Sequence, residues 1–104
     1  MEKVPNTQKI RRITMKPTAI TQCDIGGDWY KNEIEIEFFP DECYPDYMVV
    51  QKWIMDNIDG KRLNIEDVVD QIYKYLDETY SPSGLFIRDI VTGNKVHFDV
   101  IVEK

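Results

Sequence analysis

The sequence predicts an α+β domain in which an antiparallel sheet carries two helices on one face. Charged and apolar side chains alternate with period two over residues 33–38, which is typical of a half-buried strand. Apolar side chains then recur at helical spacing in two successive segments, and two β-rich runs close the chain. Since 104 residues suit one domain, we expect a single domain spanning residues 1–104.

The first half of the chain predicts two strands separated by a loop. Residues 10–15 mix apolar and charged side chains before Pro17, as a short strand does. Residues 22–28 are rich in Gly and Asp, which favour turns. The alternating strand over Glu33–Phe38 follows and ends at Pro40, which has no N–H for a strand ladder.

The middle of the chain predicts two helices. The first follows Pro45 and stops at Asp59-Gly60, and its apolar positions have offsets 0, 3, 4 and 8: Val50, Trp53, Ile54 and Ile58. The second begins with Asn64 and Asp67 in a capping arrangement and ends at Ser81-Pro82.

The end of the chain predicts a hairpin. Two β-rich runs, Leu85–Val91 and Val96–Val102, flank residues 92–95, where Gly and Asn tolerate a tight turn. The order is therefore strand, strand, helix, helix, strand, strand. The segments show no internal repeat and no low-complexity linker.

Charge is distributed unevenly along the chain. The net charge is −6, which disfavours bulk binding of nucleic acid, but residues 1–16 form a basic N-terminal segment with a net charge of +4. This segment is either a basic arm or a charged edge strand protected against aggregation. Apolar runs are too short to cross a membrane and no signal peptide is apparent, so we expect a cytoplasmic protein with no membrane partner.

The two cysteines, Cys23 and Cys43, are too few for a disulfide scaffold. With His97 as the one histidine and no Cys-x-x-Cys, no metal site is expected. Gly-rich phosphate loops and Gly-x-Ser-x-Gly elbows are also absent from the sequence. We expect Cys43 to be inert and His97 to be structural.

The predicted order is the layout of the tunnelling fold, or T-fold, and one segment resembles a particular family that uses it. Residues 23–30, Cys-Asp-Ile-Gly-Gly-Asp-Trp-Tyr, are followed by Ile34, Ile36 and residues 38–41, Phe-Phe-Pro-Asp. This pattern is similar to the signature of the QueF family of 7-cyano-7-deazaguanine reductases: a nucleophilic Cys, a Gly-containing loop, an alternating strand and an aromatic end with Pro. The resemblance is best over residues 23 to about 73.

The resemblance implies roles for particular residues. Cys23 would add as a thiolate to a nitrile carbon, because this modest electrophile needs a strong nucleophile. The alternative is a small apolar side chain at a strand end. The family's acid lies seven residues after the Cys, where this chain has Tyr30, so the proton donor would be Asp28, five residues after it, or Tyr30 itself. As a turn residue, Asp28 would have no such role.

Glu66 matches the family's substrate-binding Glu, although Ile65 replaces the preceding His. One carboxylate can accept two parallel hydrogen bonds from the edge of a guanine-like ring. The alternative is an ordinary first-turn Glu stabilised by the helix dipole.

The resemblance places the family's NADPH motif on residues 46–53. Asp46 is an acid where the family has Glu, and Trp53 is an aromatic where the family has an aromatic. Lys52 is the basic residue within this segment, whereas Gln51 stands where the family has Lys. These three residues would be cofactor-binding. The motif is degraded, which puts NADPH binding in doubt.

Three functions follow from the resemblance. The first is NADPH-dependent reduction of the nitrile of 7-cyano-7-deazaguanine through a cysteine thioimide, in queuosine tRNA modification. The second is that of the QueF-like amidinotransferases, which convert the thioimide to an amidine on tRNA and would use the basic segment for phosphate contacts. The third is a non-catalytic T-fold protein that binds a purine or pterin. All three imply a small bicyclic base as ligand and a homo-oligomer with sites between subunits.

Overall fold

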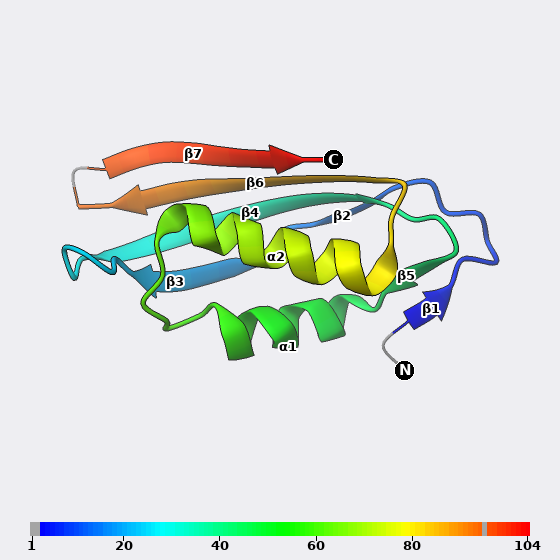
Figure 1. The fold of residues 1–104 in the computed structure, drawn as a ribbon, viewed down its shortest axis with the longest axis horizontal. Helices are drawn as coiled ribbons and strands as arrows, with labels where there is room; N and C mark the ends of the chain where they lie inside the picture. The colour runs from blue at the N-terminus through cyan, green and yellow to red at the C-terminus, as the bar shows by residue number, and fades with distance from the viewer. Residues whose placement is uncertain (1–2, 95) are drawn as a thin grey trace.

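The computed structural model describes residues 3–94 and 96–104, which form one sheet of five strands, a small two-stranded sheet and two helices (Figure 1). Lys95 of the predicted turn lies outside the described residues. The elements in chain order are β1 (Lys3–Pro5), β2 (Ile13–Met15), β3 (Thr18–Gln22), β4 (Trp29–Phe39), β5 (Cys43–Pro45), α1 (Tyr47–Asn57), α2 (Ile65–Tyr80), β6 (Gly84–Gly93) and β7 (Val96–Glu103).

Strand β4 is the centre of the main sheet. It pairs with β6 along one side, and β6 pairs with β7; all pairings are antiparallel. On its other side β4 pairs first with β3 and then with β2. The predicted strand over residues 10–15 is thus reduced to β2, and β3 was not predicted. The break between them lies at Pro17, whose carbonyl accepts from the Ile34 N–H at 2.9 Å.

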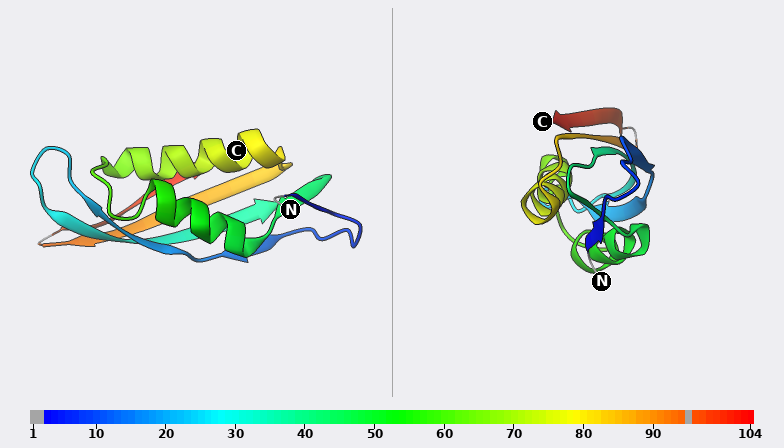
Figure 2. Two further views of the ribbon diagram at one scale, coloured as in Figure 1. Left: turned by 90° about the horizontal axis from the view of Figure 1, so that it is seen from below. Right: turned by 90° about the vertical axis from the view of Figure 1, so that its right-hand side faces the viewer.

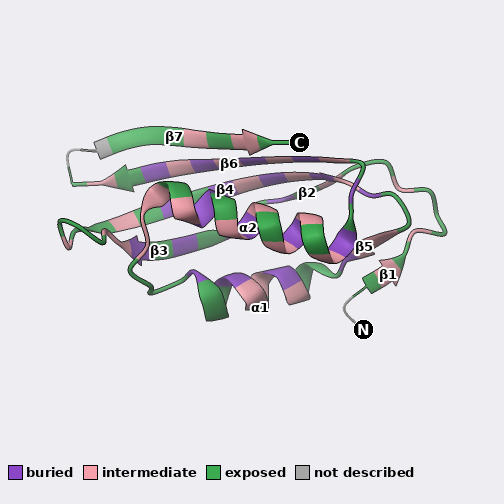
Figure 3. Cartoon of the chain, in the orientation of Figure 1, coloured by how far each residue is buried: buried purple, intermediate pink, exposed green. Residues whose placement is uncertain are grey.

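Both helices cover the same face of the sheet, as predicted (Figure 2). The inward positions of β4 and β6 alternate with exposed or half-buried ones along each strand, and α2 shows a buried stripe toward the sheet (Figure 3). Burying this apolar stripe stabilises α2 more than helix propensity does. The largest fully buried side chains come from both layers: Tyr80, Phe38, Ile34, Ile36, Ile54, Ile58, Ile72, Leu76, Leu85, Ile87, Val50 and Val68.

The helix ends differ from the sequence expectation in one respect. Asp46 caps α1, because its carboxylate accepts from the Met48 N–H at 2.8 Å. Asn64 is the N-cap of α2 but its side chain makes no capping hydrogen bond. The predicted capping arrangement is therefore wrong in its side-chain contact, and the backbone carbonyl of Asn64 accepts from Asp67 instead.

Candidate functional site at the Cys23 loop

A tight loop joins β3 to β4 and carries Cys23. The Cys23 N–H donates to the Asp28 carbonyl at 2.7 Å, and the Gly27 N–H donates back to the Cys23 carbonyl at 3.1 Å. Gly27 has φ +77°, a conformation that glycine adopts at little cost. The Gln22 side chain also donates to the Gly27 carbonyl at 2.8 Å. The residues between Cys23 and Asp28 are thereby folded back over the thiol.

The loop backbone lowers the pKa of the Cys23 thiol. The Gly26 N–H donates to Sγ at 3.4 Å and is the largest cause, followed by the N–H of Ile25. Smaller lowering contributions come from the Tyr30 side chain and the Gly27 N–H, while desolvation opposes them. Converging backbone N–H groups form an anion-binding concavity. This arrangement favours the thiolate, which is the nucleophilic form of cysteine.

Tyr30 lies on β4, and its side chain contributes to lowering the pKa of the Cys23 thiol. Its own pKa is raised, first by desolvation and then by the charges of Cys23 and Asp28. The Tyr30 ring covers Gly93 on β6, where any Cβ would overlap the ring. Tyr30 therefore stays protonated under conditions in which Cys23 ionises, and its position depends on a glycine in the neighbouring strand.

Asp28 is exposed at the start of β4. Within the described part of the chain its carboxylate has no hydrogen bond or ion pair, and it influences Tyr30 through charge. Of the two acids that the sequence offers, Tyr30 is the one whose side chain contributes to the lowered pKa of the thiol.

The segment between the helices brings the start of α2 to this loop. Residues 60–63 run along the edge of β3, where the Gln22 N–H donates to the Lys61 carbonyl at 2.9 Å and the Leu63 N–H donates to the Gln22 carbonyl at 3.1 Å. Arg62 donates from its guanidinium to the Asp24 carbonyl at 3.2 Å. Sequence reasoning missed Arg62, because it lies 38 residues from Asp24 and no local pattern marks the contact.

Glu66 lies in the first turn of α2, one turn after Leu63, and is exposed. No hydrogen bond or ion pair engages its carboxylate within residues 3–94 and 96–104. Cys23, Tyr30 and Glu66 thus occupy the same end of the molecule, with Glu66 free to bind a ligand.

Three polar side chains are buried in the sheet: Thr21 and Asn32 near this end, and Asp89 opposite Ile34 in the middle of β4. The Asn32 amide donates to Thr21 Oγ1 at 2.9 Å and to the Ala19 carbonyl at 3.2 Å. Among the described residues neither carboxylate oxygen of Asp89 has a hydrogen-bond partner, and desolvation raises the pKa of Asp89 to about 7. Sequence reasoning missed Asp89, although its place between Ile87 and Val91 in the inward series of β6 was a usable signal.

The three residues predicted to bind the cofactor make other contacts. Asp46 caps α1, Lys52 pairs with Asp56 at 3.2 Å, and Trp53 stacks on Tyr75 with ring centroids 4.3 Å apart. The hollow beside Lys52 and Trp53 has a volume of about 180 Å³ and includes the Asp56 carboxylate. Ligand pockets typically measure about 300–1,000 Å³, and a carboxylate repels phosphate. These residues do not fit the NADPH site that the resemblance implies.

The remaining candidates have structural contacts. Cys43 packs against the core with Sγ 3.6 Å from the Tyr80 carbonyl, and it is a free thiol like Cys23. His97 is exposed on β7, with Nδ1 3.4 Å from Thr92 Oγ1. Among the described residues no group of three His, Cys, Asp or Glu side chains is arranged to hold a metal ion. Neither described helix has the length and hydropathy needed to span a membrane.

Comparison with known proteins identifies the fold. No family model matches the sequence, and no curated protein matches it. The structure matches the crystal structure of the archaeosine synthase QueF-Like in the apo form, with a TM-score of 0.76 over 90% of this chain and 93% of that chain, at 15% identity. The α+β layout predicted from the sequence is confirmed, and this chain has the T-fold that it shares with the QueF-like archaeosine synthase.

Proposed function

We propose that this protein is a QueF-like enzyme that captures the nitrile of 7-cyano-7-deazaguanine, or of a similar bicyclic base, as a covalent thioimide on Cys23. The observation that carries the proposal is the environment of the thiol: the Gly26 N–H donates to Sγ at 3.4 Å, and the loop backbone, with a smaller contribution from Tyr30, lowers the pKa of Cys23. The similarity to an archaeosine synthase QueF-Like supports it further.

In the proposed first step the Cys23 thiolate attacks the nitrile carbon. A carbon–sulfur bond forms, one carbon–nitrogen π bond breaks, and its electron pair goes to nitrogen. Tyr30 donates the proton that the nitrogen takes up, and solvent returns a proton to Tyr30. The raised pKa of Tyr30 suits this role, because the phenol keeps its proton while the neighbouring thiol has lost its own.

In the proposed second step ammonia or another amine attacks the thioimide carbon. The new carbon–nitrogen bond forms as the carbon–sulfur bond breaks, which leaves an amidine and restores the thiol. Two observations favour this route over reduction by NADPH: the solved structure that the chain matches, and the other contacts of Asp46, Lys52 and Trp53. A nicotinamide cofactor, when bound, would supply hydride to the thioimide and yield an amine instead.

Glu66 is the proposed anchor for the base. Its carboxylate can accept two parallel N–H bonds from the amidine edge of a guanine-like ring. Its freedom from other partners within the described part of the chain is consistent with this role.

We further propose that the site lies between subunits of a homo-oligomer. Ile25 in the Cys23 loop is 90% exposed and the adjacent Trp29 is 53% exposed, so apolar surface surrounds the thiol. Apolar side chains grouped beside a functional residue are typical of an interface. A second copy covering them would enclose the site and exclude water.

The proposal is tested by following the fate of the base. The protein is incubated with 7-cyano-7-deazaguanine and then with ammonium or with NADPH. The small-molecule products are separated and their masses are determined by mass spectrometry. We expect an amidine with ammonium, no product from Cys23→Ala, and unchanged product from Cys43→Ala.

An aminomethyl product formed only with NADPH would show the reductase instead. Binding of the base that is equal in the parent and Cys23→Ala, with no product in either, would show the non-catalytic ligand-binding protein. That result would overturn the proposal of an enzyme.

A further inference from the structure

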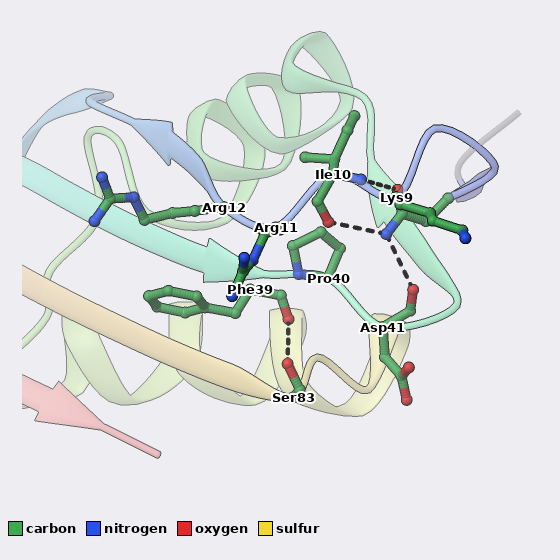
Figure 4. A pocket seen from close by; sticks show the side chains of 9 residues that line it. Lys9, Ile10, Arg11, Arg12, Phe39, Pro40, Asp41 and Ser83 are labelled. Carbon is green, nitrogen blue, oxygen red and sulfur yellow. Dashed lines mark hydrogen bonds between the residues drawn. The ribbon is translucent and has the colours of Figure 1, made fainter.

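A pocket lies at the opposite end of β4 from the Cys23 loop. It has a volume of about 710 Å³ and is formed where the segment before β2 passes the end of β4 (Figure 4). Strand β4 runs from Trp29, next to the Cys23 loop, to Phe39, which lines the pocket. Because a strand rises about 3.4 Å per residue, the eleven residues of β4 separate the two sites by most of the length of the molecule.

The pocket is basic in a protein that is acidic overall. Lys9, Arg11 and Arg12 line it together with a single acid, Asp41, whereas the whole chain has a net charge of −6. Arg12 is paired with Glu37 at 3.4 Å. Lys9 and Arg11 have no acidic partner within the described part of the chain, so their charges are available to an anionic ligand.

The segment that carries these cations is held in place by Asn6. The side-chain Oδ1 of Asn6 accepts from the Ile10 N–H at 2.8 Å, and its side-chain Nδ2 donates to the carbonyls of Ile10 at 3.0 Å and Asp41 at 3.2 Å. These bonds close the loop over Lys9, which has φ +59°. One side chain therefore fixes the basic segment against the residues that follow β4, and the pocket is formed before any ligand binds.

One wall of the pocket is apolar. Phe39 packs against Gly84 so closely that a Cβ there would come 3.1 Å from the ring, and Pro40 continues the wall. Phe39 adjoins Arg11 in the pocket, with Lys9 at the other end (Figure 4). Cations beside an aromatic ring match a ligand that carries both phosphate and a planar ring.

We propose that this pocket binds the phosphate of a nucleotide, with Lys9 and Arg11 contacting the phosphate and Phe39 contacting the base. The volume lies within the range of small-molecule sites, about 300–1,000 Å³. The phosphate belongs either to a free nucleotide or to one unit of an RNA strand, since the contacts are the same. A free nucleotide at this site would be independent of the chemistry proposed at Cys23, whereas an RNA strand would agree with the phosphate contacts that the amidinotransferase resemblance implies for the basic segment.

The test measures binding of four probes to the full chain by titration calorimetry: AMP, ATP, adenosine and a short single-stranded RNA. Binding of AMP or ATP identifies a free nucleotide as the source, and binding of the RNA alone identifies a strand. Adenosine, which has no phosphate, is expected to bind at least tenfold more weakly than AMP or not at all. Failure of AMP, ATP and the RNA alike to bind would overturn the proposal.

Variants locate the site. Arg11→Gln is expected to weaken binding roughly tenfold, since hydrogen bonds to charged groups are the stronger ones. Lys74→Gln on α2 removes the same charge far from the pocket and is expected to change affinity less than twofold. Asn6→Ala changes no charge but releases the loop, so it is expected to weaken binding as well. Equal losses in Arg11→Gln and Lys74→Gln would show general charge attraction and contradict the site.

Discussion

Tyr30, near the start of β4, interacts electrostatically with the Cys23 thiol in the loop that precedes this strand. The interaction lowers the pKa of the thiol and raises that of the phenol. One pair of side chains therefore supplies an ionisable nucleophile and a proton donor at the same point. This is the chemistry that addition to a nitrile needs.

Removing the Tyr30 hydroxyl should raise the pKa of the Cys23 thiol. In Tyr30→Phe the thiol loses one of the interactions that lower its pKa, so the pH midpoint of Cys23 alkylation by iodoacetamide should move upward. The loop N–H groups remain, so the midpoint should stay below that of an unperturbed thiol. Cys43→Ala serves as the background for both proteins, which leaves one alkylation site. An unchanged midpoint would contradict the interaction.

Gly93 should matter to the thiol although it lies on another strand. Gly93→Ala places a Cβ in the Tyr30 ring, so the ring must move and the alkylation midpoint should rise as in Tyr30→Phe. Gly60→Ala is the matched control, because Gly60 has φ +76° but open space around it. The control should lose about 1–2 kcal/mol of stability, the cost of an L side chain in the left-handed conformation, without a change in alkylation. A shift in both variants would mean that the effect is not carried by Tyr30.

Asp89 should make the stability of the protein depend on pH. Its pKa is about 7 in the folded state and about 3.9 in an unfolded chain. The folded state therefore holds the proton more tightly between these values, and the free energy of unfolding should fall as pH rises from about 4 to about 7. The loss is on the order of a few kcal/mol.

Urea titrations at a series of pH values measure this dependence. Asp89→Asn should flatten the profile in the window from pH 4 to 7, whereas Asp70→Asn, an exposed position on α2, should leave it unchanged. An equal slope in the parent and Asp89→Asn would show that Asp89 does not titrate in its buried position.

The stack between Trp53 and Tyr75 should stabilise the folded protein and should not contribute to cofactor binding. The rings join α1 to α2 at 4.3 Å with planes 4° apart. Trp53→Ala should cost about 3 kcal/mol, in the range for loss of a large aromatic side chain, and lower the thermal midpoint. A variant of unchanged stability that had lost measurable NADPH affinity would reverse this interpretation.

Periodicity in the sequence predicted the elements that face the core. The alternation over Glu33–Phe38 corresponds to buried positions in β4, and the helical spacing of Val50, Ile54 and Ile58 corresponds to buried positions in α1 and at its C-cap. These patterns are strong because each follows from a single apolar face. The order of elements then predicted the T-fold layout.

Periodicity did not predict the short strands or the contacts of the site. β1 and β5 have three residues each, too few for a pattern, and β3 is an edge strand in which only Ala19 and Thr21 are buried. The interaction between Tyr30 and Cys23 depends on the register of β3 against β4, which the sequence does not state. Asp46 was assigned to a cofactor because of its motif position, and the motif gave no sign that its carboxylate caps α1.

Capture of a nitrile by Cys23 is tested most directly by intact-mass spectrometry of the protein mixed with 7-cyano-7-deazaguanine. Addition to a nitrile expels no leaving group, so the protein mass should rise by the full mass of the base, and peptide mapping should place the addition on Cys23. Cys43→Ala should form the same adduct and Cys23→Ala should form none. An unmodified parent protein, under conditions in which an active nitrile reductase forms its adduct, would contradict the account.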